Sequence, residues 1–181
     1  MLYALSLLAC TGGVDDSTPA DTTDSVDPGP LALASVSFAD GAEFPDEHTC
    51  AGADRQPELH WTGAPDGTLS FALTLTDESI DYVHWVAFDI EPATAALVEG
   101  ASDDGALPDG SDEARAYGTK YKGPCPQGNE HTYTFTLWAL SAASTDFTAT
   151  NPIAAADLDA AFGASTIETA SFSGTSDASP P

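Results

Sequence analysis

Residues 69–90 read LSFALTLTDESIDYVHWVAFDI, and this stretch decides the fold class. Apolar residues alternate with small or polar residues on both sides of segment 78–82, which is the period of a β-strand and not of a helix. Segment 78–82 is short enough to form a hairpin-like connection. The stretch therefore predicts two neighbouring antiparallel strands.

The same alternation continues along the chain from Leu31 onward. The apolar runs are rich in β-branched and aromatic residues and are bounded by Gly, Pro or Asp, as strands are. The predicted strands cover residues 33–38, 58–61, 69–76, 83–90, 133–140 and 165–174.

An Ala-rich helix is predicted over 153–162. Asn151 can cap this helix, Pro152 suits its first turn, and Gly163 follows its last apolar residue. The predicted fold class is mostly β: an antiparallel β-sandwich with one or two short peripheral helices.

The composition limits the kinds of partner. The chain has 181 residues, with 29 acidic and 4 basic side chains, and a formal charge of −25. Its length suits one domain with extensions and a real core. A surface with this much negative charge repels DNA, RNA and anionic lipid head groups. We therefore expect no nucleic-acid partner. The charge favours solubility, in particular in a salty environment, and the EF-hand pattern of calcium-binding loops is absent from the sequence.

The first nine residues, MLYALSLLA, are almost wholly apolar, and Cys10 follows at once. The run is too short to cross a bilayer but has the length of the apolar core of a signal peptide. The sequence Leu7-Leu8-Ala9-Cys10 resembles a bacterial lipobox, in which the cysteine carries two lipid chains and forms a stable anchor. We expect a lipoprotein signal peptide over 1–9 and an exported, membrane-anchored protein on the periplasmic side or the cell surface. The alternative is a cysteine that follows an apolar start by chance.

The segment after Cys10 reads TGGVDDSTPADTTDSVDPGP and has almost no large apolar residues. Such a segment cannot bury enough surface to offset the entropy lost on ordering. We expect a lipidated cysteine and a disordered acidic tether over 10–30, a folded domain over 31–176 and a flexible tail over 177–181.

If Cys10 carries lipid, the two remaining cysteines, Cys50 and Cys125, are left as a pair. In an oxidising compartment they can form a disulfide that closes a long loop. The sequence does not give the distance between their Cα atoms, so two unpaired thiols remain the alternative.

Polar residues continue the apolar faces of three predicted strands. Asp77 continues the face of Leu73 and Leu75, and His131 and Tyr133 continue the face of Phe135. By the same count His84 shares a face with Val86, Phe88 and Ile90. A turn over 78–82 would bring Asp77 beside His84, where a carboxylate raises the pKa of an imidazole and can fix its tautomer. Buried polar groups of this kind mark either a pocket or a satisfied structural network, and these residues alone do not separate the two.

A constrained loop, Gly123-Pro124-Cys125-Pro126-Gln127-Gly128, stands just before His131. Glycine permits close approach of the backbone to a ligand, and exposed backbone N–H groups can bind an anion. Of the four basic residues, Arg115, Lys120 and Lys122 fall within eight positions upstream of this loop. They would focus positive potential there, unless they are an ordinary cluster of exposed loop charges.

An ordered series of short motifs resembles the phosphatidylethanolamine-binding protein family, and specifically its bacterial Raf-kinase-inhibitor-like branch. The series runs through Phe38, Asp40-Gly41, Thr49-Cys50-Ala51-Gly52-Ala53-Asp54, Pro57-Glu58-Leu59-His60-Trp61, Ala64-Pro65-Asp66-Gly67, Val83-His84-Trp85-Val86, Gly123-Pro124-Cys125-Pro126, Gly128, His131 and Tyr133. It covers roughly residues 35–140, most of the predicted domain.

The resemblance implies a sandwich of one large and one smaller sheet and a pocket near the strand ends for phosphate-like or other small anions. The implied ligand-binding residues are Asp77, His84, Gly123, Pro124, His131 and Tyr133. It further implies that His84 and Tyr133 donate hydrogen bonds to the anion while Asp77 orients His84. This chain departs from the family pattern in the segment Glu78-Ser79-Ile80-Asp81, which replaces P-D-A-P, and at Gln127 and Thr132. These departures bear on the ligand but not on the fold.

The leading hypothesis is thus a lipid-anchored binding or regulatory module, without a cofactor, for a small anion or a phospholipid head group. One alternative is a metal-assisted hydrolase that uses Asp77, His84 and His131, although neither G-x-S-x-G nor H-E-x-x-H occurs. The other is a structural or adhesive surface β-sandwich. The sequence names no protein partner.

Overall fold

The computed structural model describes residues 29–104, 107, 110–114, 120–148 and 152–181. The predicted signal peptide, Cys10, nearly all of the predicted tether, Arg115 and Asn151 lie outside the described residues.

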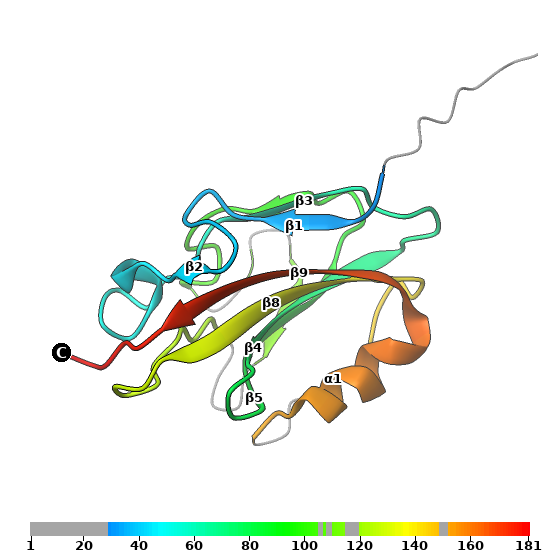
Figure 1. Ribbon diagram of the computed structural model, residues 1–181. Helices are drawn as coiled ribbons and strands as arrows, with labels where there is room; N and C mark the ends of the chain where they lie inside the picture. The colour runs from blue at the N-terminus through cyan, green and yellow to red at the C-terminus, as the bar shows by residue number, and fades with distance from the viewer. Residues whose placement is uncertain (1–28, 105–106, 108–109, 115–119, 149–151) are drawn as a thin grey trace, which may run out of the picture.

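Two sheets form the molecule, as predicted for a sandwich of unequal layers (Figure 1). The large sheet has the order β2-β9-β8-β4-β5-β7, and the small sheet has the order β1-β3-β6. The strands are β1 (Ala32–Ala34), β2 (Ala42–Glu43), β3 (Leu59–Thr62), β4 (Ser70–Asp77), β5 (Tyr82–Ile90), β6 (Ala96–Leu97), β7 (Asp112–Ala114), β8 (His131–Leu140) and β9 (Thr166–Ser176). All pairings are antiparallel except that of β2 with β9.

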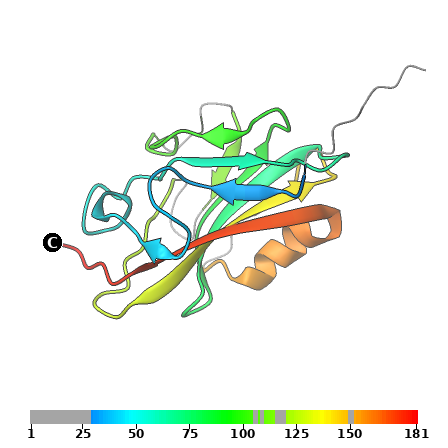
Figure 2. The same cartoon turned by 45° about the horizontal axis from the view of Figure 1, so that its top comes forward.

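Strand β4 explains why residues 69–90 are so apolar. All eight of its residues are buried, because β4 lies inside the large sheet and both faces of that sheet are covered. The small sheet covers one face, and helix α1 (Ala155–Phe162) covers the other (Figure 1). Turned by 45°, the molecule shows the small sheet in front and the orange α1 behind the red strand β9 (Figure 2).

The two faces bury separate apolar clusters. Phe71, Leu73 and Leu75 of β4 point into the core between the sheets, together with Trp61 of the small sheet. Residue Ala72 points the other way, into the cluster that α1 forms with β5. The predicted alternation of β4 is therefore confirmed.

Two β-bulges in β5 break the face assignment that simple alternation gives. Leu75 of β4 pairs with Trp85 and Thr76 pairs with Val83. Adjacent residues of β4 are thus opposite residues of β5 that are two positions apart, and His84 is the extra, unpaired residue. A second irregularity precedes Ile90, where Asp89 has a φ of 58°.

As a result, the prediction that His84 shares a face with Val86 and Phe88 is wrong. Those two side chains lie in the cluster under α1, whereas the His84 ring contacts Tyr133, which belongs to the core between the sheets. The bulge thus directs the imidazole to the side of the sheet opposite α1.

Helix α1 begins two residues later than predicted. The Asp157 carboxylate accepts a hydrogen bond from the backbone N–H of Ala154 at 2.9 Å, which satisfies one free donor at the helix start. The apolar face buries Leu158 and Phe162 against the large sheet. Two short 3-10 helices, Asp46–His48 and Gly163–Ser165, complete the helical content of the described chain. Nowhere in the described chain does a helix have the length and apolarity needed to cross a bilayer.

Candidate functional site

Three strands of the large sheet bring the predicted polar residues to one end of the sandwich. Strand β4 ends at Asp77, which lies opposite Tyr82 of β5 on one side and opposite Tyr133 of β8 on the other. The ring centroids of His84 and Tyr133 are 5.3 Å apart, and those of His131 and Tyr133 are 6.3 Å apart. We call Asp77, His84, His131 and Tyr133 the strand-end cluster.

The Asp77 carboxylate lies at the centre of this cluster and is only 1% exposed. One carboxylate oxygen accepts a hydrogen bond from Nδ1 of His131 at 2.7 Å, and the other accepts the backbone N–H of Ser79 at 2.9 Å. The expectation that Asp77 orients His84 is therefore corrected, because the imidazole that Asp77 holds is His131. Because His84 is the extra residue of the bulge, it has no partner on β4 and does not lie beside Asp77 as a simple antiparallel pairing would place it.

His84 is held by the backbone of the neighbouring loop. Its Nδ1 donates to the carbonyl oxygen of Lys122 at 3.2 Å, which fixes the ring in the Nδ1-protonated tautomer. The ring also stands edge-on to Tyr82 at 5.0 Å and to Tyr133. Burial lowers the pKa of His84 below its ordinary 6.5, and the nearby Asp77 carboxylate opposes that shift only in part. The ring is therefore neutral at neutral pH.

Tyr133 is fully buried, and its hydroxyl forms no hydrogen bond of normal geometry with a described residue, while the Asp77 carboxylate and the Cys125 backbone lie close enough to shift its pKa. Burial is the main cause of a raised pKa of this phenol, and the negative charge of Asp77 adds to it. The hydroxyl is consequently a neutral donor inside the strand-end cluster. A buried hydroxyl without a partner costs free energy, so its presence needs a reason.

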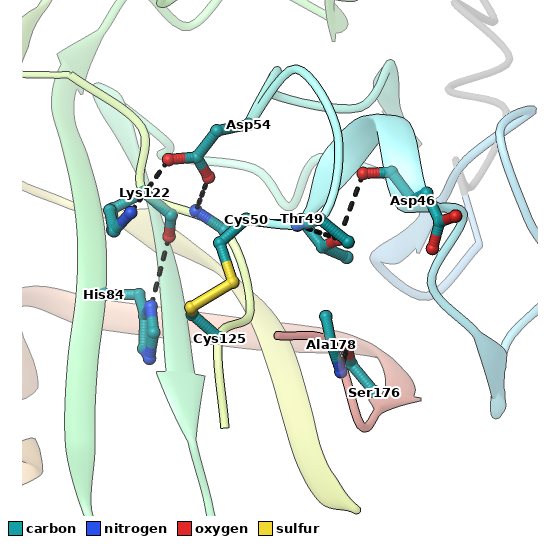
Figure 3. Close-up of a disulfide and its surroundings, with 11 residues drawn as sticks. Asp46, Thr49, Cys50, Asp54, His84, Lys122, Cys125, Ser176 and Ala178 are labelled. Atoms are coloured by element: carbon teal, nitrogen blue, oxygen red, sulfur yellow. Dashed lines mark hydrogen bonds and ion pairs between the residues drawn. A yellow bond between two sulfur atoms is a disulfide. The ribbon is translucent and has the colours of Figure 1, made fainter. Parts of the chain in front are cut away.

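A disulfide holds the loop that carries the His84 acceptor (Figure 3). The Cα atoms of Cys50 and Cys125 are 5.4 Å apart, and the predicted disulfide is confirmed. A backbone hydrogen bond of 3.1 Å from Cys50 to Pro124 runs beside it. The link spans 75 residues of sequence, and closing a loop of that length stabilises the fold by about 4 kcal/mol.

Asp54 provides a second attachment for this loop. Its two carboxylate oxygens accept the backbone N–H of Gly123 at 2.7 Å and the Lys122 ammonium at 3.0 Å (Figure 3). Gly123 is required here, since an added Cβ atom would lie 2.1 Å from the His48 carbonyl oxygen. The sequence prediction missed Asp54 as a site residue, although its motif was noted, because nothing in the sequence pairs it with residues 69 positions away.

Two of the three basic residues noted in the sequence, Lys120 and Lys122, lie in the described chain. The ammonium of Lys122 is paired with Asp54, and Lys120 is exposed. The predicted ligand-binding residues Gly123 and Pro124 do lie in the loop beside His84, one and two positions after the carbonyl that holds its ring.

The metal-hydrolase alternative finds no support in this geometry. Among the described residues, no three His, Cys, Asp or Glu side chains are grouped in a way that could hold a metal ion. Asp77 and His131 are instead joined directly by a hydrogen bond.

Comparisons with known proteins agree with this fold. The sequence model of the phosphatidylethanolamine-binding protein family matches residues 34–177. A UPF0098 protein of Methanothermobacter thermautotrophicus is 39% identical over 115 residues, which are 61% of this chain and 76% of the relative. LppC of Mycobacterium tuberculosis, whose name describes it as a lipoprotein, is 35% identical over 161 residues, which are 79% of this chain and 77% of the relative.

Two solved structures share the fold. YbcL of E. coli, described as a member of the mammalian PEBP family, superposes with a TM-score of 0.69 at 25% identity, covering 83% of this chain and 99% of YbcL. The homologue CT736 of Chlamydia trachomatis superposes with a TM-score of 0.65 at 23% identity, covering 81% of this chain and 96% of CT736. The chain belongs to the phosphatidylethanolamine-binding protein family.

Proposed function

We propose that this protein binds a small phosphate-like oxyanion at the strand-end cluster and the adjoining backbone at Gly123 and Pro124. The observation that carries the proposal is the convergence of Asp77, His84, His131 and Tyr133 at one end of the large sheet, where the buried Tyr133 hydroxyl forms no hydrogen bond of normal geometry with a described residue. The family name of its relatives supports a phosphate-bearing ligand.

The surroundings of that hydroxyl favour a ligand over a purely structural role. His84 and His131 each use Nδ1 for a hydrogen bond within the protein, to Lys122 and Asp77 respectively. The hydrogen bonds of these two rings to described residues run through Nδ1, and the Gly123 backbone also lies close enough to raise the pKa of His84. The Nε2 edges of the rings and the Tyr133 hydroxyl are therefore the groups that a small polar ligand would contact. A satisfied structural network would have used these groups internally.

We further propose that the protein is exported and held at a membrane by lipid on Cys10. The lipobox-like sequence and the relative that is named as a lipoprotein support this. Mass spectrometry of protein from its native host would find diacylglycerol on Cys10, and a Cys10→Ser variant would leave the membrane fraction. An unmodified Cys10 in membrane-associated material would refute the anchor.

Calorimetric titration with inorganic phosphate tests the binding site. His84→Ala should weaken binding at least tenfold, which is about 1.4 kcal/mol. His60→Ala is the matched control, since His60 lies on β3 in the small sheet, is partly exposed and, within the part of the chain that the structure describes, pairs its side chain with Glu58. Phosphate binding that is absent, or that is lost equally in both variants, would refute the proposal.

A further inference from the structure

We propose that one end of the sandwich rests on the bilayer that holds the lipid of Cys10, and that the strand-end cluster faces away from this bilayer. The inference rests on the proposed lipid anchor and adds the surface through which the folded domain contacts the membrane. It follows from the place where the described chain begins and from the side chains that surround that place.

The described chain begins at one end of the sandwich. Pro30 packs against loop 63–69, because a Cβ atom added to Gly63 would clash with the Pro30 carbonyl oxygen. Leu31 donates its backbone N–H to the carboxylate of Glu168, near the start of β9, at 3.1 Å. Figures 1 and 2 show this blue start of the chain and the C-terminus at opposite ends of the molecule. Residues 11–28, a stretch of 18 residues, join this end to Cys10 and span at most about 65 Å.

Two exposed apolar side chains lie at the same end. Leu69 is 50% exposed and Ile167 is 40% exposed. Leu69 comes directly before β4, and its backbone N–H donates to the carbonyl of Leu140, the last residue of β8. Ile167 is the extra residue of a bulge in β9, because Thr166 and Glu168 on either side of it pair with adjacent residues of β8.

The Ile167 side chain reaches loop 63–69, since a Cβ atom added to Gly67 would lie 3.9 Å from its Cδ1 atom. A backbone hydrogen bond of 2.8 Å from Ser141 to Ser165 joins the two other loops of this end. Loops 63–68, 141–144 and 163–165 consist of Gly, Ala, Ser, Thr and Pro apart from Asp66. We call Leu69, Ile167 and these three loops the tether-end surface, and it carries little charge for a chain with 29 acidic residues.

The other exposed large apolar side chains of the described chain are Val36, Ile80 and Val98, and each has an acidic neighbour. These neighbours are Glu58, whose carboxylate accepts the Val36 N–H, Glu78 and Asp81 on either side of Ile80, and Glu99 directly after Val98. A carboxylate beside an apolar side chain opposes its transfer to a lipid surface. The tether-end surface is therefore the better match to a bilayer.

The anchor makes a small contact sufficient. Because the lipid of Cys10 holds the domain close to the bilayer, docking of the tether-end surface is an intramolecular step with a high effective concentration. Burial of the two apolar side chains then favours the docked state. The formal charge of −25 opposes contact with anionic lipids, so the surface fits zwitterionic head groups.

Strand β4 sets the distance between this surface and the anion site. Leu69 precedes β4 and Asp77 ends it, so eight residues, or about 26 Å, separate the tether-end surface from the strand-end cluster. With the tether-end surface on the bilayer, the strand-end cluster is open to the solution and takes its anion from there.

Tryptophan fluorescence on vesicles tests this orientation. The lipidated full-length protein from its native host is placed in phosphatidylcholine vesicles whose acyl chains carry bromine, which quenches tryptophan. Leu69→Trp reports on the tether-end surface, and Ile167→Trp provides a second probe of it. Ile80→Trp is the matched control, because Ile80 is also exposed and lies at the other end of β4, between Asp77 and Tyr82.

Relative to the wild type, we expect the emission added by Leu69→Trp or Ile167→Trp to be quenched at least about twofold more than that added by Ile80→Trp, since an apolar face enters the interface by about 5–10 Å. Equal quenching at the two ends, or stronger quenching for Ile80→Trp, would overturn the inference and leave the anchor standing. A wild-type protein that does not float with the vesicles would overturn both. A soluble Cys10→Ser dimer that Leu69→Asp dissociates would show that this surface joins two copies and not a copy to a bilayer, which also refutes the inference.

Discussion

Replacing Tyr133 with Phe removes one hydroxyl and leaves the ring, which packs against His84 and Phe44, in place. This hydroxyl is buried and forms no hydrogen bond of normal geometry with a described residue. Leaving a polar group buried and unpaired costs about 1–3 kcal/mol, so Tyr133→Phe should raise the free energy of unfolding by about 1 kcal/mol. For a chain of this size that shift corresponds to a Tm about 2–4 °C higher.

Ligand binding should change in the opposite direction. A hydrogen bond to a charged group contributes about 1.5–3 kcal/mol, so losing the Tyr133 donor should weaken phosphate binding by about 10- to 100-fold. Thermal unfolding measures the first effect, and calorimetric titration measures the second. If the Tyr133 hydroxyl serves ligand binding, Tyr133→Phe should be more stable than the wild type and should bind phosphate more weakly.

Tyr121→Phe is the control, because it should change the free energy of unfolding in the opposite direction. The Tyr121 hydroxyl is also buried, but it donates to the His48 carbonyl at 3.0 Å, so its removal should destabilise the protein by about 1 kcal/mol. If Tyr133→Phe destabilises the protein as Tyr121→Phe does, the hydroxyl has an internal partner. Tyr133 would then be a structural residue and not part of a ligand-binding site.

Four further outcomes follow from the structure. Replacing Cys50 and Cys125 together with Ser should lower the free energy of unfolding by about 4 kcal/mol in denaturant titrations, and an unchanged midpoint would contradict this. Gly123→Ala should be strongly destabilising because its methyl group meets a carbonyl oxygen at 2.1 Å, whereas Gly163→Ala, with open space and a φ of −54°, should be neutral or slightly stabilising. Because the pKa of His84 is lowered by folding, its contribution to stability is complete above the unfolded value of 6.5 and is lost as the pH falls through the folded value. The stability difference between the wild type and a His84→Asn variant should therefore shrink on acidification, and a constant difference would contradict the lowered pKa. Raising the salt concentration from about 0.1 M to about 1 M shortens the Debye length from about 10 Å to about 3 Å and should raise the Tm, because the formal charge is −25; a falling Tm would show that self-repulsion is not limiting.

Long alternating runs could be read correctly from the sequence. The pattern of residues 69–90 gave both central strands within one residue at each end, since central strands of a covered sheet bury nearly every side chain. The short edge strands β2, β6 and β7 carry only two or three residues each, which is too few for any periodicity to be visible.

The strand-end cluster was found in the right place but with the wrong internal pairing. Alternation assigns side chains to the two faces of a sheet only while each residue of one strand pairs with one residue of its neighbour. The bulge at His84 adds an unpaired residue to β5, and no local sequence signal marks that residue. The imidazole consequently bonds to the Lys122 backbone, and Asp77 pairs with His131 across the sheet. The role of Asp54 depends on a tertiary contact between two loops, which sequence spacing does not encode.

The most direct test of the anion site is a crystal soaked with cacodylate and measured at the arsenic absorption edge. Cacodylate has the size of a phosphate group and, when protonated, carries a hydroxyl. We predict one dominant anomalous peak beside the Tyr133 hydroxyl and Nε2 of His84. Arsenic peaks confined to exposed side chains such as Lys120, with none at the strand-end cluster, would contradict the account.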